Sequence, residues 1–312
     1  MPLQIDTNTE LIQSPLNYTG GKYKLLPQIL PLFPKDIDIF VDIFCGGGNV
    51  GINAAADKVI FNDKNKYLIG ILENFFQPEE KLFRHIDEII QEYGLSESAK
   101  YGFAYYNTTG TKGLAKYNRN KYLRLREDFN NADVKDEKYY LMLYVLIVYA
   151  FNNQIRFNRK EQFNLPPGKR DFNNTIKMKL KRFINRLAWG NYEFSALDFR
   201  EFSLSKLTEN SLVYVDPPYL ISCAQYNEKG GWNAGDELDL LNFLDDLTNK
   251  NIRFALSNVI RCKGKENSIL IDWLKQHDSK YRIEKLNFDY NHSNYKINNK
   301  NLITEEVLIM NY

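Results

Sequence analysis

The chain has 312 residues and a net charge of only +2, with 44% hydrophobic and 26% charged residues, an ordinary balance for a globular protein with a well-buried core. So small a net charge excludes nucleic-acid binding through total charge alone, and any such surface must come from local clustering. Three cysteines without a paired spacing and three histidines argue against a disulfide framework and a zinc site, so no metal is expected. The polar first ten residues, and apolar runs too short to span a bilayer, predict a cytoplasmic protein without a membrane partner.

The first part of the chain predicts a strand, a helix and a second strand. Residues 37–44, IDIFVDIF, are apolar and rich in β-branched side chains and end at glycines, which is typical of a buried parallel strand. Residues 48–56 then predict the start of a helix. Residues 58–61, KVIF, predict a second short strand that ends at Asn62 and Asp63.

A helical and basic region follows. Patterns such as residues 80–93 and 138–151 predict helices between polar loops, and the apolar run at 141–151 predicts a buried helix. Lysines and arginines then crowd together from Arg156 to Arg186, with few acidic residues between them. Most of these lysines are interpreted as a solvated or phosphate-only face.

After Trp189 the α/β pattern returns. It predicts strands at residues 192–196, 212–215, 252–256, 281–286 and 306–310, with helices at 237–247 and 268–276. The simplest architecture is one α/β domain built from residues 1–74 and 187–312. A mainly helical insertion at residues 75–186 interrupts it, with a hairpin near 151–170.

The glycine-rich segment after the first strand is a candidate ligand loop. Gly46, Gly48 and Gly51 satisfy G-x-G-x-x-G between a strand and a predicted helix. Asp63 ends the next strand, where a carboxylate can hold ribose hydroxyls. This pattern alone fits a nicotinamide cofactor, S-adenosylmethionine or merely a tight turn.

The sharper motif is Asp216-Pro217-Pro218-Tyr219, which follows the apolar strand LVYV. An adenine amino nitrogen is a poor nucleophile because its lone pair is delocalised into the ring. The Asp216 carboxylate and the Pro217 carbonyl can each accept one of its hydrogens and so localise the lone pair. Proline keeps the loop rigid, and Tyr219 can stack on a base flipped from the duplex. A plain strand-end turn would explain Asp-Pro but neither the tyrosine nor the glycine loop upstream.

A third motif lies near the N-terminus, at residues 15–22, PLNYTGGK. Its glycine pair bends the chain beside Tyr18 and Lys22. Lys22 could bind a methionine carboxylate, and Tyr18 could pack near the cofactor. A solvated lysine on a loop is the simpler reading of this segment taken alone.

Together, the ordered motifs resemble the Dam-type DNA adenine methyltransferases over essentially the whole chain. The likeness implies a Rossmann-like S-adenosylmethionine-dependent methyltransferase sheet with an inserted, mainly helical DNA-recognition domain. It implies methyl transfer from S-adenosylmethionine to the exocyclic amino nitrogen of adenine in a specific duplex DNA sequence, by base flipping and direct displacement. Asp216 to Tyr219 would hold the adenine. Cofactor contacts are implied for Tyr18, Lys22, Asp42, Phe44, Gly46, Asp63, Asp198, Phe199 and Asp216.

The hairpin segments at 151–158 and 163–168 are similar to the family's recognition hairpin. The likeness implies DNA contacts from Phe151, Asn152, Arg156, Asn158, Asn164 and Pro166, with Arg156 reading a guanine. The loop at 220–228 differs from the best-known solitary members. The recognition sequence, with GATC or a related ATG/ATC core as one guess, is therefore left open. So is the choice between a solitary, a viral and a restriction-modification role with a separate endonuclease.

Other readings explain less of the sequence. A carbon-5 cytosine methyltransferase usually carries its nucleophilic cysteine after a proline, and none of the three cysteines has that position. An amino-cytosine methyltransferase more often has serine where Asp216 stands. An RNA adenine methyltransferase is disfavoured by the basic insertion with its hairpin. A nicotinamide dehydrogenase leaves Asp216 to Tyr219 unexplained, and a non-enzymatic DNA-binding protein leaves the whole catalytic motif unexplained.

Overall fold

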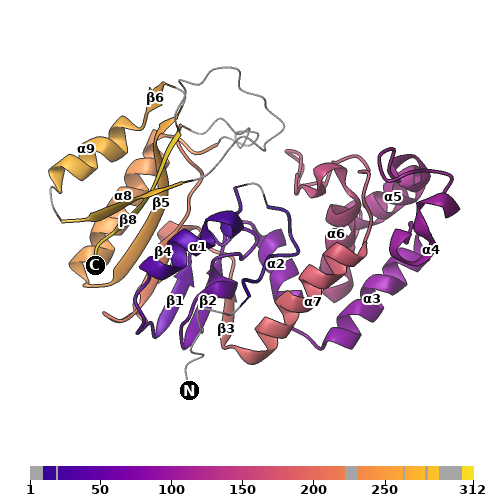
Figure 1. The fold of residues 1–312 in the computed structure, drawn as a ribbon, viewed down its shortest axis with the longest axis horizontal. Coiled ribbons are helices and arrows are strands. Elements are labelled where there is room, and N and C mark those ends of the chain that lie inside the picture. The colour runs from indigo at the N-terminus through magenta and orange to yellow at the C-terminus, as the bar shows by residue number, and fades with distance from the viewer. Residues whose placement is uncertain (1–9, 19, 222–230, 263, 278–279, 288–303) are drawn as a thin grey trace.

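A twisted sheet of mixed strands forms the centre of the protein (Figure 1). The computed structural model describes residues 10–18, 20–221, 231–262, 264–277, 280–287 and 304–312. The strands run in the order β3-β2-β1-β4-β5-β8-β7, with β6 paired to β5. The strands β3, β2, β1, β4 and β5 are parallel, β6 and β8 pair with β5 in antiparallel fashion, and β7 pairs with β8 in the same way. They are β1 (Ile39–Asp42), β2 (Lys58–Asn62), β3 (Tyr192–Ser195), β4 (Leu212–Val215), β5 (Arg253–Cys262), β6 (Lys265–Glu266), β7 (Arg282–Leu286) and β8 (Thr304–Met310).

Helices lie on both faces of this sheet and in a group beside it. The helices α3 to α7 come between β2 and β3 in the chain and gather at one end of the molecule (Figure 1). The α-helices are α1 (Leu26–Ile29), α2 (Lys66–Asn74), α3 (Glu79–Glu92), α4 (Ser98–Tyr105), α5 (Ala115–Asn130), α6 (Glu137–Tyr149), α7 (Asn174–Trp189), α8 (Ala234–Asn249) and α9 (Ser268–Gln276). Short 3-10 turns are η1 (Lys22–Leu25), η2 (Leu30–Leu32), η3 (Gly51–Asn53), η4 (Phe151–Asn153) and η5 (Phe199–Glu201).

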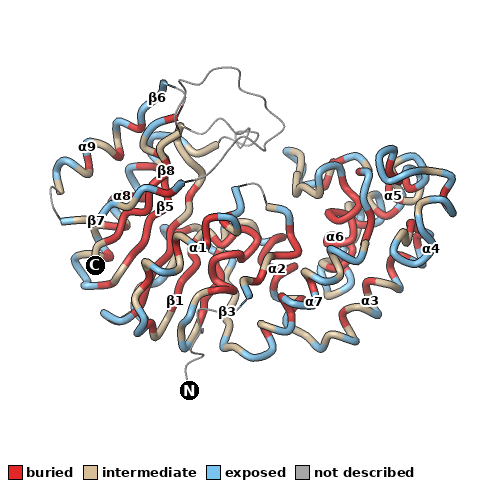
Figure 2. The backbone as a smooth tube through the Cα atoms, in the orientation of Figure 1, coloured by how far each residue is buried: buried red, intermediate tan, exposed pale blue. Residues whose placement is uncertain are grey.

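Two hydrophobic clusters cover the two faces of the sheet. Strand β4 shows why, because its four apolar residues point alternately to opposite sides. Leu212 and Tyr214 join the cluster on the side of α1 and α2, whereas Val213 and Val215 join the cluster under α8 and α9. All four are fully buried, as the red strands in Figure 2 show. This burial on both faces is typical of central parallel strands.

Helix α6 ties the inserted helices to the sheet. Its residues Leu141 to Tyr149 are all buried, which confirms the buried helix predicted from the apolar run. It packs against α2, α3 and α5, and the cluster that covers one face of the sheet continues through it without a break. Within the described part of the chain, no helix is long and apolar enough to cross a membrane.

The prediction of a helix at residues 48–56 is wrong. The chain makes only the short turn η3 there, and Ala54 is already extended. Gly46 and Gly48 have positive φ angles of 51° and 76°, which a helix does not allow. The amide of Gly51 donates to the Asp42 carboxylate at 2.9 Å instead of starting a helical ladder. Side chains thus take the backbone groups that a helix would have paired with one another.

The α/β fold class with a Rossmann-like sheet is confirmed. Predicted strands and helices elsewhere lie within a few residues of the observed ones, apart from β5, which runs on to Cys262. A set of helices does separate β2 from β3. The division into a catalytic part and a recognition part stays a prediction, because one hydrophobic cluster runs through both.

Candidate active site

Acidic residues end neighbouring parallel strands at one edge of the sheet. Asp42 is the last residue of β1, Asp63 directly follows β2, and Asp216 directly follows β4. Strand order reverses between β1 and β4, because β2 lies on one side of β1 and β4 on the other. Open α/β sheets bind their ligands at such a switch point, outside the carboxyl ends of the strands. The topology therefore brings together three acidic residues that the sequence singled out.

The glycine loop passes between these carboxylates. The amide of Gly46 donates to Asp63 Oδ2 at 3.0 Å, and Asp63 Oδ1 accepts from Asn65 at 2.8 Å. A Cβ atom on Gly46 would lie 2.8 Å from Cδ1 of Tyr18, so the tyrosine ring packs directly on the glycine backbone. Both the positive φ and this close approach require glycine here. The N-terminal motif and the glycine loop are thus in contact, and the packing of Tyr18 near a cofactor stays a prediction.

Lys22 is buried at the centre of the site. Its Nζ lies 2.8 Å from Asp216 Oδ1 and 3.6 Å from Glu306 Oε1, and only 6% of its side chain is exposed. The Tyr219 hydroxyl donates to Asp216 Oδ1 and Glu306 Oε1, both at 3.1 Å. Nζ also lies 5.0 Å from the centre of the Tyr219 ring. The N-terminal motif and the motif Asp216 to Tyr219 therefore meet in one hydrogen-bonded cluster.

Burial governs the protonation of this cluster. Burial disfavours the charged form of Lys22, but Asp216 and Glu306 outweigh this effect and raise its pKa. Burial raises the pKa of Asp216; Lys22 lowers it and Glu306 raises it further. Burial, with the nearby charges of Asp216 and Asp63, also raises the pKa of Asp42 to about 8. Lys22 is thus the group that opposes the rise in the pKa of Asp216 that burial and Glu306 cause.

Aromatic side chains line the site beside Asp198. Phe44 packs against Phe199 with ring centres 5.4 Å apart, and Trp232 lies 5.8 Å from Phe44 and 5.9 Å from Phe199. Asp198 caps the turn η5, and Lys64 lies 3.0 Å from its carboxylate. The predicted residues Phe44, Asp198 and Phe199 are therefore neighbours.

Residues 150–168 form the predicted hairpin. Ala150 pairs with Pro167 and Phe157 with Phe163, both antiparallel. The Phe157 ring stacks on Tyr67 of α2, with ring centres 4.3 Å apart. This contact fixes the hairpin against the helix that follows β2.

The predicted DNA-binding residues divide by the contacts they make in the hairpin. Arg156 Nε donates to Asn164 Oδ1 at 2.9 Å, which orients the guanidinium, and Phe151 is 51% exposed. The Asn158 side chain accepts from the amides of Lys160 and Gln162 and so shapes the turn. Asn152 and Pro166 contribute backbone carbonyls, which accept from Asn17 Nδ2 and the Phe151 amide at 2.9 Å each. Arg156 and Phe151 remain the hairpin's best candidates for DNA contact.

Sequence reasoning missed Glu306 and Trp232. Glu306 is 4% exposed and comes from β8, the strand between β5 and β7. A charged residue inside the apolar run EVLIM was its only signal, because nothing in the sequence pairs β8 with the distant Asp216. Residues 222–230, most of the loop that departs from the family's pattern, lie outside the described residues.

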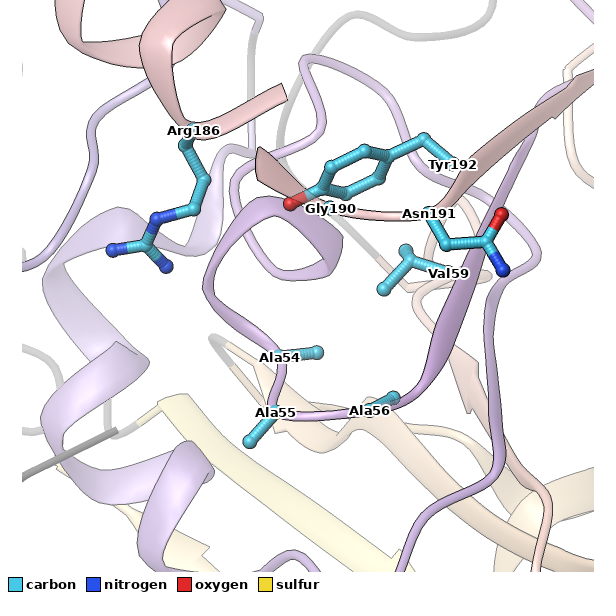
Figure 3. A pocket seen from close by; sticks show the side chains of 8 residues that line it. All are labelled: Ala54, Ala55, Ala56, Val59, Arg186, Gly190, Asn191 and Tyr192. Carbon is cyan, nitrogen blue, oxygen red and sulfur yellow. The ribbon is translucent and has the colours of Figure 1, made fainter. Parts of the chain in front are cut away.

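A small pocket lies at the opposite edge of the sheet. Figure 3 shows it lined by Ala54 to Ala56, the Tyr192 ring and Arg186, where β2 and β3 begin. It encloses about 30 Å³, room for about one or two water molecules. It lies where β2 and β3 begin, whereas the carboxylate cluster lies where β1, β2 and β4 end, so this pocket is separate from the cluster.

Comparisons with known proteins agree with this geometry. A family model described as D12 class N6 adenine-specific DNA methyltransferase matches residues 18–288. The chain is 41% identical over 308 residues to Type II methyltransferase M.FokI of Planomicrobium okeanokoites, which covers 96% of this chain and 43% of that protein. Modification methylase StsI of Streptococcus sanguinis is 42% identical over 318 residues, covering 99% of this chain and 44% of the methylase.

A more distant relative matches over most of its own length. DNA adenine methylase of Haemophilus influenzae is 26% identical over 269 residues, covering 86% of this chain and 81% of the methylase. By contrast, the chain spans less than half the length of M.FokI and StsI. The family model nevertheless covers the N-terminal motif, the glycine loop, the hairpin and the acidic motif of β4. The chain belongs to the D12 class N6 adenine-specific DNA methyltransferases.

Proposed function

We propose that this chain transfers a methyl group from S-adenosylmethionine to the exocyclic amino nitrogen of adenine in a specific duplex DNA sequence. The observation that carries this proposal is the buried pair of Lys22 and Asp216, 2.8 Å apart, at the head of the sequence Asp216-Pro217-Pro218-Tyr219. The pair places the Asp216 carboxyl group at the switch point of the sheet, beside a rigid proline turn and an aromatic ring.

The side chains at the site suit a cationic ligand. Carboxyl groups of Asp42, Asp63, Asp216 and Glu306 outnumber the single ammonium of Lys22, and burial raises the pKa of the three aspartates. A positive ligand would lower those pKa values, whereas the pyrophosphate of a nicotinamide dinucleotide would raise them. This charge balance favours S-adenosylmethionine over the dinucleotide that the glycine loop alone also allows.

We assign the two ends of the cofactor to different residues. Asp63, Phe44, Asp198 and Phe199 would hold the nucleoside, since they combine ribose acceptors with aromatic faces. The remaining contacts would fall to the methionine part and to the loop beneath it, from Tyr18, Lys22, Asp42, Gly46 and Asp216. When bound, the cofactor supplies an electrophilic methyl group on its sulfonium.

The protein's own groups would prepare the adenine. Asp216 accepts one hydrogen of the amino group, and the Pro217 carbonyl accepts the other, so the nitrogen lone pair is directed outward. Tyr219, positioned by Asp216 and Glu306, stacks on the flipped base. Catalysis on this model comes from positioning and from fixed polar groups, without a covalent enzyme intermediate or a metal.

The hairpin and the helices around it would select the sequence. On this proposal, residues 1–74 and 187–312 carry the chemistry and residues 75–186 carry DNA recognition. Arg156, held by Asn164, would present its guanidinium to a guanine in the major groove.

On this proposal, the enzyme acts on cellular DNA in the cytoplasm. The names of M.FokI and StsI favour a restriction-modification role, in which a separate endonuclease is the partner.

Product analysis tests the proposal. The chain is incubated with labelled S-adenosylmethionine and duplex DNA, and the DNA is digested to nucleosides. The expected product is N6-methyladenine, and a folded Asp216→Ala variant should give none. Recovery of N4-methylcytosine, or no transfer to a broad mixture of duplex sequences, would contradict the proposal.

A further inference from the structure

A second cleft lies away from the carboxylate cluster. It encloses about 380 Å³ between the N-terminal segment 13–17 and the helices α6 and α7. Its polar lining comes mainly from Ser14, Asn17, Asn153, Arg170, Thr175 and Lys179. No acidic side chain lines it among the described residues, so its charge is positive.

The two cations of this cleft differ from their neighbours on α7. Lys181 lies 2.8 Å from Glu79, and Lys177 lies 3.9 Å from Asp87, so each has an acidic partner on α3. Among the residues that the structure describes, neither Arg170 nor Lys179 has a carboxylate within ion-pair distance. The cleft therefore contains two cations whose charge no carboxylate of the described residues compensates.

These two cations also repel each other. Lys179 is partly buried, and burial together with the charge of Arg170 lowers its pKa. A partly buried lysine beside a second positive charge is unfavourable by itself. An anion bound between Lys179 and Arg170 would offset both the burial of the charge and the repulsion between the two cations. A phosphate fits this chemistry, because serine, threonine and asparagine side chains can supply further hydrogen bonds to its oxygens.

We infer that this cleft binds one backbone phosphate of the DNA, and that Lys179 and Arg170 hold it. The inference rests on the proposed function. DNA is favoured over a free anion because the cleft continues into the recognition hairpin: Asn17 and Asn153 line it, and Asn17 Nδ2 donates to the Asn152 carbonyl at 2.9 Å. A phosphate contact gives affinity without sequence information.

Salt dependence of DNA binding tests the inference with a control from the same helix. Lys179→Ala and Lys181→Ala each remove one positive charge, but Lys181 is already paired with Glu79. We expect Lys179→Ala to reduce the slope of log K against log salt by about 0.9, the value for one phosphate contact. Lys181→Ala should leave the slope unchanged. Equal slopes for Lys179→Ala and the wild-type protein would overturn the inference.

Neutralised DNA locates the phosphate. A series of duplexes carries a single uncharged methylphosphonate at successive positions, and binding is measured with the wild-type and Lys179→Ala proteins. One position should weaken wild-type binding and have no further effect on the variant. If no position shows this pattern, the cleft does not hold a DNA phosphate.

Two further measurements separate the alternatives. Lys179-dependent binding of inorganic phosphate, combined with unchanged DNA binding by Lys179→Ala, would assign the cleft to a small anion and overturn the inference. Methyl transfer by the wild-type protein is measured in the same preparation. If the wild-type protein transfers methyl groups but wild-type and Lys179→Ala proteins have equal salt slopes, only the assignment of the cleft is contradicted. If the wild-type protein transfers no methyl group, the proposed function is contradicted.

Discussion

The carboxyl edge of the sheet and the hairpin at 150–168 hold their charged side chains in opposite ways. At the sheet edge, Lys22, Asp216 and Glu306 are largely buried and bind one another. In the hairpin, Arg156 is half-buried and bound to an uncharged partner, Asn164. The carboxylate cluster is therefore held in place by its own contacts, whereas the hairpin leaves guanidinium donors of Arg156 that no charged partner takes. The energy of a buried charge changes strongly when any of its partners is replaced, because the surrounding dielectric constant is low. Water screens a half-exposed charge, so its energy changes mainly when a ligand binds to it.

The largest effect is expected from Asp216→Ala. The substitution removes the carboxylate that accepts a hydrogen of the adenine amino group, so the rate of methylation should fall by at least about a hundredfold. Thermal unfolding and circular dichroism check that the variant is folded. Lys22 keeps Glu306 as a second partner, so the fold should survive the change. Near-normal turnover by a folded variant would refute the assignment of Asp216.

Lys22→Met should move the acid limb of the pH–rate profile. Activity needs ionised Asp216 and is lost as pH falls through the pKa of that carboxyl. Lys22 lowers this pKa, so its removal should shift the acid limb to higher pH. Activity at neutral pH should drop, and part of it should return in alkaline buffer. Calorimetry with S-adenosylmethionine should also show weaker binding; unchanged binding and an unchanged pH profile would contradict the role of Lys22.

Arg156→Ala should relax the choice of one base pair. A bidentate contact with guanine contributes about 1–3 kcal/mol of discrimination, which corresponds to roughly a 5- to 150-fold ratio between cognate and mismatched sites. Methylation is compared on duplexes that differ by one base pair. Asn164→Ala, which frees the guanidinium without removing it, should reduce discrimination less. Equal losses on cognate and mismatched DNA would make Arg156 a phosphate contact.

Glu306→Gln is the mildest change and the opposite of Lys22→Met. The glutamine can still accept from Tyr219, so turnover should fall by about tenfold or less. Because Glu306 raises the pKa of Asp216, its neutralisation should shift the acid limb to lower pH. The two variants should therefore move the pH–rate profile in opposite directions. A shift in the same direction would show that Glu306 does not act on Asp216 through its charge.

The periodicity predicted nearly all strands and helices, and the motifs singled out residues that the fold brings close together. Gly46, Asp63 and Asp216 lie together because the parallel strands before them end at one edge of the sheet. Tyr18 and Lys22 reach the same place from the N-terminal segment, through contacts with Gly46 and Asp216. That they hold cofactor and adenine stays a prediction.

Two features depended on partners that are distant in the sequence. The helix expected after the glycine loop was lost because Asp42 captures the Gly51 amide. Glu306 could not be predicted at the site, because the antiparallel placement of β8 depends on packing across the whole sheet. A local sequence pattern predicts neither a hydrogen bond to a distant side chain nor the pairing of a distant strand.

The unbroken core through α6 bears on how specificity can change in this protein. Because α6 packs on α2 and belongs to the cluster that covers the sheet, the helices that carry the hairpin are not a detachable module. Transplanting residues 75–186 from a relative would replace one half of a close-packed interface and leave cavities or overlaps in the other half. Single substitutions on the hairpin's exposed face meet no such obstacle. On the proposed function, a new recognition sequence therefore evolves more easily by substitutions at the tip of this region than by exchange of the whole region.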